Sequence, residues 1–137
     1  MERFEEARRC FLQALRDLRA AGESLRTESY EWSSFQSQKA AEKAVKALGY
    51  ALGRTSWGHS VTELLEGLRE SLPEAGSYLR DSRELDRHYI PSRYPNAFES
   101  GYPALYYDVE AASRAVECAR RIIDWVEGML KRLGVKI

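Results

Sequence analysis

Arg93 and Tyr94 stand between two prolines, Pro91 and Pro95, in the stretch YIPSRYPNA. Each proline fixes its own backbone φ angle, so the side chains between them lose little conformational entropy when a ligand binds. An arginine guanidinium offers a fork of donors that matches a phosphate, and a tyrosine ring stacks on a base. The pair therefore predicts a site for a nucleotide-type ligand. In the alternative interpretation, Arg93 pairs with a carboxylate and Tyr94 fills one end of a helical bundle.

Four other side chains have the chemistry to meet an anion. His59 precedes a predicted helix, where free backbone N–H groups favour anions and an imidazole can transfer a proton. Lys39, Lys43 and Lys46 recur along one face of another predicted helix and are candidates for phosphate contacts. Each has a structural alternative, because a histidine at a helix start often only forms a hydrogen bond and lysines often form a solvated face.

These lysines belong to a long predicted helix within residues 28–53, around which we expect the chain to be organised. Glu42 precedes Lys46 by four residues, in the order that favours an ion pair, and Gly53 suits the C-cap. Alanines beside the apolar stripe leave room for more than one neighbouring helix, which predicts a central position. The stripe has three- and four-residue spacing and consists of Trp32, Phe35, Ala41, Ala44, Val45, Leu48, Ala51 and Leu52.

The same periodicity predicts four further helices. The first runs from Phe4 to Leu25, and the short polar break after it favours an antiparallel hairpin. Ser60 with Glu63 forms a capping box at the start of the third, and Pro73 ends that helix or interrupts it. The fourth has an apolar face from residue 75 to residue 89. The last begins after Asp108 as its N-cap and ends at Gly134.

Residues 90–107 lack this periodicity, carry three prolines and several aromatic residues, and predict an ordered Pro/Tyr-rich loop before the last helix. No segment alternates like a strand. We therefore expect one all-α domain over residues 1–137, an up-and-down four-helix bundle with an additional short helix. Trp125, Tyr78 and Trp32 are expected in its core.

Composition narrows the classes of function. The 137 residues contain 21 Lys and Arg and 21 Asp and Glu, so any nucleic-acid site must be a local patch rather than a global basic field. The N-terminal residues lack the apolar core of a signal peptide, and no run is long enough to span a bilayer, which predicts a cytoplasmic protein without membrane contact. Cys10 and Cys118 lie within helical patterns and are expected to be packed free thiols. We expect no cofactor and no metal site.

Several segments in order resemble the HEPN domain family, the helical domains of higher eukaryotes and prokaryotes named for nucleotide binding. They are Asp17-Leu18 with Ala21, then FQSQKAAEKAVKAL, GHSVTELL and YIPSRYPNA, so that the similarity covers nearly the whole chain and points to the subgroup that carries the last motif. The resemblance implies a homodimeric helical bundle, often encoded beside a minimal nucleotidyltransferase as a toxin–antitoxin-like pair. Its most specific residues are Phe35, Gln38, Ala41, Glu42, Lys46, His59, Tyr89, Arg93, Tyr94 and Pro95.

Some members of the family are metal-independent RNA-cleaving toxins, which carry an arginine followed after four to six residues by a histidine. Arg83 and His88 in RELDRH have this spacing. Such a pair can supply the proton acceptor and the cation that cleavage through a 2′-hydroxyl requires. Against this role, five helical steps separate the two by roughly 140°, nearby acids would repel a phosphate, and Tyr89 directly adjoins His88 instead of following after one residue. The family's usual glutamine pair is also replaced here by Gln38 and Lys39.

Three hypotheses follow for the function. In the first, a non-catalytic module binds nucleotide or RNA through Tyr89, Arg93 and Tyr94 together with His59 and the lysines, and acts with a separately encoded minimal nucleotidyltransferase. In the second, the protein is a ribonuclease that uses Arg83 and His88. In the third, it is only a structural dimerisation domain. We expect a homodimer in which helices of both subunits, including the central one, bring their loops toward a shared cleft, because the aromatic residues leave more surface than a chain this small buries alone. These aromatic residues are Trp57, Phe98, Tyr102, Tyr106 and Tyr107. In the alternative, the long aromatic loop folds back over its own bundle and the protein is a monomer.

Overall fold

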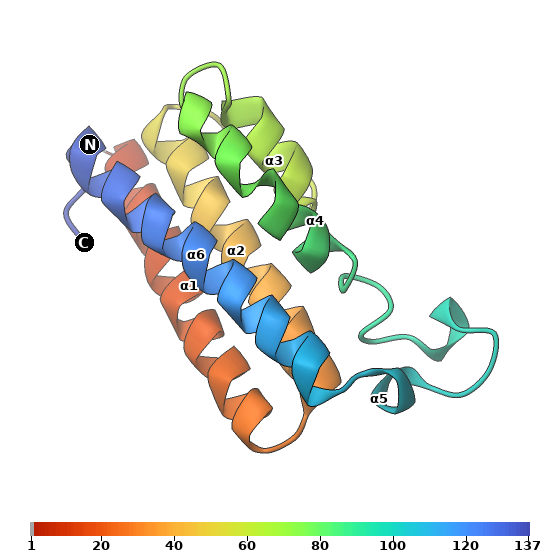
Figure 1. Cartoon of the computed structure of the whole chain (residues 1–137). Helices are drawn as coiled ribbons and strands as arrows, with labels where there is room; N and C mark the ends of the chain where they lie inside the picture. Colours follow the sequence, from red (N-terminus) through yellow and green to blue (C-terminus); the bar gives the residue numbers. More distant parts are fainter. Residues whose placement is uncertain (1) are drawn as a thin grey trace.

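The computed structural model describes residues 2–137 and contains only helical elements within them. Three long helices lie side by side, with shorter ones packed against them (Figure 1). The long helices are α1 (Glu2–Arg26), α2 (Tyr30–Ala51) and α6 (Val109–Leu133). The short ones are α3 (Val61–Leu68), α4 (Leu79–Asp86), α5 (Pro103–Tyr106) and the 3₁₀ turns η1 (Pro73–Tyr78) and η2 (Pro95–Ala97). The all-α prediction is confirmed.

Helix α2 has the central position that its alanines predict. Thirteen of its 22 residues are buried, against four of the 25 in α1, because α2 is covered by α1, α6 and the α3–α4 pair. The hairpin from α1 to α2 turns at Glu28, whose φ of 66° lies in the left-handed region. Small side chains bring these two helices close together, and the buried Ser33 hydroxyl donates to the Ala21 carbonyl at 2.8 Å.

The predicted helix ends are confirmed in atomic detail. The Ser60 hydroxyl accepts from the Glu63 amide, and the Asp108 carboxylate accepts from the Ala111 amide. Gly53 follows α2 at φ 78°, a left-handed conformation that a residue without a side chain adopts freely, and its amide donates to the Tyr50 carbonyl at 2.9 Å. Each of these capping bonds joins residues three positions apart, which is why the sequence alone identifies them.

Helices α3 and α4 are shorter than α1, α2 and α6. Both α3 and α4 have eight residues, and the 3₁₀ turn η1 lies between them in the chain. Pro73 has no amide hydrogen to continue α3 and begins the 3₁₀ turn instead. The predicted apolar face is nevertheless present, because Ala75, Leu79 and Leu85 are all buried. Tyr89 lies beyond the end of α4.

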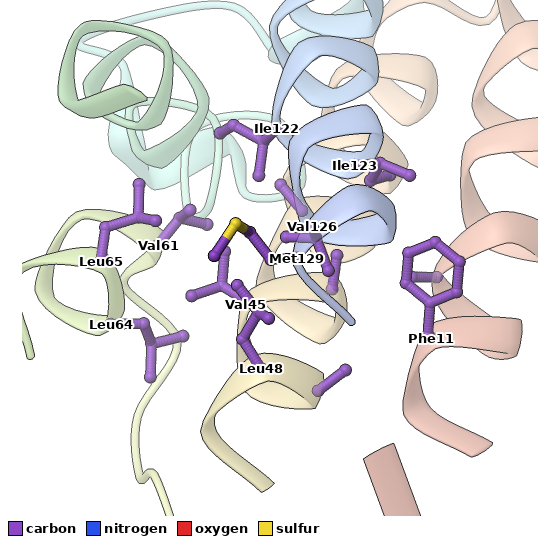
Figure 2. Packing of buried hydrophobic residues seen from close by; sticks show 14 of the residues in the cluster. Phe11, Val45, Leu48, Val61, Leu64, Leu65, Ile122, Ile123, Val126 and Met129 are labelled. Atoms are coloured by element: carbon purple, nitrogen blue, oxygen red, sulfur yellow. The ribbon is translucent and has the colours of Figure 1, made fainter. Parts of the chain in front are cut away.

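A single core joins all the layers, as Figure 2 shows for the side chains of α2, α3 and α6 and for Phe11 of α1. Tyr78 and Trp125 stack at 4.9 Å between ring centroids and pack against this core, as predicted. Trp32 does not belong to it. Its side chain is 48% exposed and contacts Phe35 edge-on at 6.1 Å, because the start of α2 extends past the cover that α3 and α4 provide.

Cys10 and Cys118 are free thiols, half-buried and buried respectively, as expected. Burial raises the pKa of the Cys118 thiol to about 12, so this group stays protonated. In residues 2–137, none of the helices combines the length and apolar content that a membrane crossing requires.

The segment between α4 and α6, which includes α5, projects away from the bundle (Figure 1). Apart from η2 and α5 it is a loop, as predicted. It contacts the bundle through Arg93, which lies over the Phe35 ring of α2, and through Tyr107, which contacts His88.

Candidate functional site

The Arg93 guanidinium lies among three aromatic rings. Its central carbon is 4.4 Å from the ring centroid of Phe35, 4.7 Å from that of Tyr89 and 4.9 Å from that of Tyr94. The Nε and Nη2 groups donate to the Tyr89 carbonyl at 3.0 and 2.7 Å. These contacts hold the guanidinium plane in place, while the remaining N–H groups have at most a long contact of 3.5 Å with the Tyr94 hydroxyl.

Neither part of the structural alternative for this pair is seen. Among residues 2–137, Arg93 has no carboxylate partner, and Tyr94 is 46% exposed instead of filling the end of the bundle. The backbone supports the arrangement, since the Arg93 and Tyr94 amides both donate to the Ile90 carbonyl. We name the surrounding group the Arg93 cluster. It consists of Trp32, Phe35, Lys39, His59, Tyr89, Arg93 and Tyr94.

The cluster gathers residues from three separate segments. The His59 ring, which precedes α3, stacks on the Tyr89 ring at 5.0 Å with an angle of 19° between the planes. Lys39 of α2 places its ammonium 5.4 Å from the Tyr89 centroid and 3.4 Å from His59 Nδ1. The His59 side chain remains 53% exposed. Five of the predicted ligand-binding residues are thus in one place.

A buried carboxylate, Glu42, compensates much of the positive charge on α2. Only 3% exposed, it forms ion pairs with Lys39 at 3.1 Å and with Lys46 at 3.0 Å, and its Oε2 lies 3.3 Å from His59 Nδ1. The predicted pair of Glu42 with Lys46 is confirmed. Lys43 lies outside the cluster, because it forms an ion pair with Asp17 of α1 at 2.6 Å. This face is therefore less basic than its lysines suggest.

Asp86 has a role that the sequence analysis missed. Its Oδ1 accepts from the Val61 amide at 2.9 Å, and its Oδ2 accepts from the Thr62 amide at 2.9 Å and from the Ser60 hydroxyl at 3.1 Å. The anion position at the start of α3 is therefore filled by a carboxylate of the chain itself. Asp86 is one of the acids near Arg83 and His88 that we expected to repel a phosphate, and this interpretation missed its structural role. No local signal identifies the contact, since its donors lie 24 to 26 residues away in the sequence.

Gln38 links this carboxylate to the Arg93 cluster. The side chain is fully buried, and its Nε2 donates to the His59 carbonyl at 2.6 Å and to Asp86 at 3.3 Å. The amide oxygen of Gln38 has no hydrogen-bond partner within residues 2–137. The backbone of His59 is therefore fixed from α2, while its ring is held by Tyr89.

The two predicted catalytic residues lie in different surroundings. His88 is buried, with Nδ1 2.8 Å from the Tyr107 hydroxyl and Nε2 3.3 Å from Glu84. Burial lowers the pKa of His88 from its usual 6.5 although Glu84 acts in the opposite direction, and burial raises the pKa of Tyr107 to about 12. Arg83 is exposed and lines a groove between α4 and α6. No hydrogen bond joins Arg83 to His88 in the described part of the chain.

Comparison with protein-family models matches residues 7–129 to the HEPN domain. The chain belongs to the HEPN domain family. HEPN domains are nucleotide-binding modules, and the cluster found here contains residues on which the sequence resemblance rests. Phe35, His59, Tyr89 and Arg93 come from positions up to 58 residues apart but contact one another in a continuous series.

Solved structures agree with this assignment. TT1696 from Thermus thermophilus is 38% identical and superposes with a TM-score of 0.86, over 90% of this chain and 97% of that one. ST0689, an archaeal HEPN homologue, is 36% identical with a TM-score of 0.78, over 91% and 98% of the two chains. The HEPN domain protein TM0613 from Thermotoga maritima is 34% identical with a TM-score of 0.74, over 90% and 98%. No curated protein matches the sequence.

Replacing Asp86 with alanine should lower the free energy of unfolding by about 2–3 kcal/mol, because several donors at the start of α3 and on Gln38 lose a charged acceptor. Urea denaturation measures this loss. Glu74→Ala is the matched control, since its ion pair with Arg132 is exposed and spans 3.7 Å, and it should cost under about 0.5 kcal/mol. Equal losses in the two variants would contradict the structural role of Asp86.

Proposed function

We propose that this HEPN domain binds a nucleotide or a short RNA at the Arg93 cluster without catalysing a reaction. The observation that carries the proposal is an arginine fixed among three rings, with no carboxylate to neutralise it among the described residues. A fixed guanidinium loses little entropy on binding, and its free N–H groups suit phosphate oxygens. An arginine that served only to stabilise the fold would more commonly be paired with an acid.

The exposed aromatic residues suit a base. Trp32 and Tyr94 are each about half exposed at the edge of the cluster, and either ring offers a face for stacking. Lys39 and the exposed His59 add donors beside Tyr89. Lys46 and Lys43 contribute least, since Glu42 pairs with the first and Asp17 with the second. The cluster thus combines aromatic faces for a base with cations for a phosphate, the two kinds of group that a nucleotide requires.

Tyr94→Ala should weaken nucleotide binding by about 1–3 kcal/mol, the value of one base stacked on an aromatic ring. Isothermal titration with the common nucleoside triphosphates and a short RNA measures it. Trp57→Ala is the control, because this aromatic residue is 87% exposed but lies outside the cluster and the projecting segment. Equal affinity in the two variants would contradict the proposal, and no binding by the unaltered protein would favour a purely structural domain.

We further propose, from the resemblance, that the domain acts with a separately encoded minimal nucleotidyltransferase in a toxin–antitoxin-like pair. The titration above provides the test when it is repeated with the product of an adjacent nucleotidyltransferase gene. Tighter nucleotide binding in the mixture supports the pairing. Unchanged binding, together with separate elution of the two proteins in gel filtration, would contradict it.

A metal-independent ribonuclease that uses Arg83 and His88 is the competing proposal. One observation favours it, since Glu84 contacts His88 Nε2 at 3.3 Å, as a carboxylate does when it orients a general base. The burial of His88 and the engagement of both its ring nitrogens weigh against it. Incubation with RNA in the presence of a chelator decides, and the non-catalytic proposal expects no cleavage. Cleavage that His88→Ala abolishes would replace our proposal with the ribonuclease.

We also propose that two copies form a homodimer through the projecting segment. Exposed apolar side chains concentrate there, since Ile90, Tyr102, Leu105 and Tyr106 are each at least 46% exposed. The middle of the segment extends away from the long helices (Figure 1), which leaves these exposed side chains available to a second copy. Trp57, 87% exposed, lies in the other loop, whereas Phe98 stacks on Tyr106 and Tyr107 contacts His88.

Light scattering at micromolar concentration measures the mass of the assembly. We expect twice the 15.7 kDa of one chain, and Leu105→Ser with Tyr106→Ser should shift the protein toward the monomer, because the apolar surface available for burial decreases. Leu12→Ser, at an exposed position of α1, is the control and should leave the mass unchanged. A mass near that of a single chain for the unaltered protein would contradict the dimer.

A further inference from the structure

A groove of about 1280 Å³ runs between α4 and α6, separate from the Arg93 cluster. Five arginines line it, three on α4 or directly after it and two on α6. Arg80, Arg83 and Arg87 follow each other at three- and four-residue spacing, and Arg114 and Arg121 are seven residues apart, so each set lies along one side of its helix. The groove is thus bordered by arginines on both walls over a length of roughly 10 Å.

The carboxylates of the groove are already engaged. Asp81 forms two hydrogen bonds with Arg121, at 2.8 and 3.1 Å. Glu84 pairs with Arg87 and contacts His88, and Asp86 is held by the amides at the start of α3. Glu117 forms an ion pair with Arg120 at 3.4 Å. The acidic residues therefore have partners of their own.

Three of the arginines that line the groove have no partner of this kind among residues 2–137. Across residues 2–137, no hydrogen bond or ion pair engages the side chain of Arg80, Arg83 or Arg114, although all three line the groove. The unmatched groups of the groove are thus three guanidiniums. Ser113 adds a hydroxyl to the same wall. Guanidiniums and hydroxyls are the groups that most often contact phosphate oxygens in nucleic-acid complexes.

We propose that this groove binds the phosphate backbone of a single-stranded oligonucleotide, with Arg80, Arg83 and Arg114 as its contacts. The inference rests on the proposed function and adds to it a second contact surface, for the phosphate backbone of a strand. The volume exceeds the roughly 300–1,000 Å³ of a pocket for a small molecule, which favours a ligand longer than one nucleotide. Arg87 of the groove and Tyr89 of the cluster lie at the same end of α4, so one strand can contact both sites. In this assignment Arg83 is a phosphate contact and not a catalytic residue.

The test uses fluorescence anisotropy with a labelled oligouridylate of about ten nucleotides, within the site sizes known for single-strand binders. The double variant Arg80→Gln/Arg114→Gln should bind it roughly tenfold more weakly, and the slope of log K against log salt should decrease by about 1.4, for two lost phosphate contacts. Arg16→Gln is the control, an exposed arginine of α1 without a partner in the described residues. Restoring charge with Arg80→Lys/Arg114→Lys should recover the salt slope.

The proposal for the groove is contradicted if the double variant matches the control in affinity and in salt slope, or if the unaltered protein does not bind the strand. The double variant should also keep its affinity for a mononucleotide. If Tyr94→Ala abolishes strand binding and the arginine double variant does not, the proposal for the cluster stands and the proposal for the groove fails. If the double variant weakens strand binding and the unaltered protein binds no mononucleotide, the proposal for the groove stands and the proposal for the cluster fails.

Discussion

The carboxylate of Asp86 is the point on which the arrangement of the candidate site depends. It lies at the end of α4 and accepts hydrogen bonds from the start of α3 and from Gln38 of α2, so that one side chain joins three helices. His59 comes just before the bonded segment of α3, and Tyr89 comes three residues after Asp86. The stacking of the His59 ring on Tyr89 therefore follows from how α3 and α4 are held together.

Glu42 shows the same principle with cations. Placed almost fully inside the bundle, it has Lys39 and Lys46 around it, because a buried charge is stable only when it is paired. Together with Asp17, which pairs with Lys43, Asp86 and Glu42 neutralise the groups that the sequence most readily suggests for anion binding, the start of α3 and the lysines of α2. Within the cluster and the groove of residues 2–137, unmatched positive charge remains at Arg93 and at three arginines of the groove, which is why both proposals centre on arginine.

The fold was predictable because its signals are local. Periodicity located the helices, and Ser60, Gly53, Asp108 and Gly134 marked their ends through contacts with residues at most a few positions away. The two flanking prolines singled out Arg93 and Tyr94 as candidates for a ligand site, and the resemblance added Tyr89. What could not be predicted depends on distant partners. Asp86 finds its donors up to 48 residues away.

Two further features escaped prediction for reasons of geometry. Periodicity shows which side of α2 is apolar but not how far its neighbours extend, so the exposure of Trp32 required the structure. The groove combines two separate helices, and each stripe of arginines taken alone is indistinguishable from a solvated helix face.

The chain contains three tryptophans, and only Trp32 belongs to the Arg93 cluster, while Trp57 lies on an exposed loop and Trp125 stacks on Tyr78. Their indole N–H resonances therefore report separately on binding in a nucleotide titration followed by nuclear magnetic resonance. If the nucleotide binds at the cluster, the Trp32 resonance shifts in proportion to occupancy while the other two stay in place. A saturating nucleotide that leaves Trp32 unmoved, or that shifts Trp57 instead, would contradict binding at the Arg93 cluster.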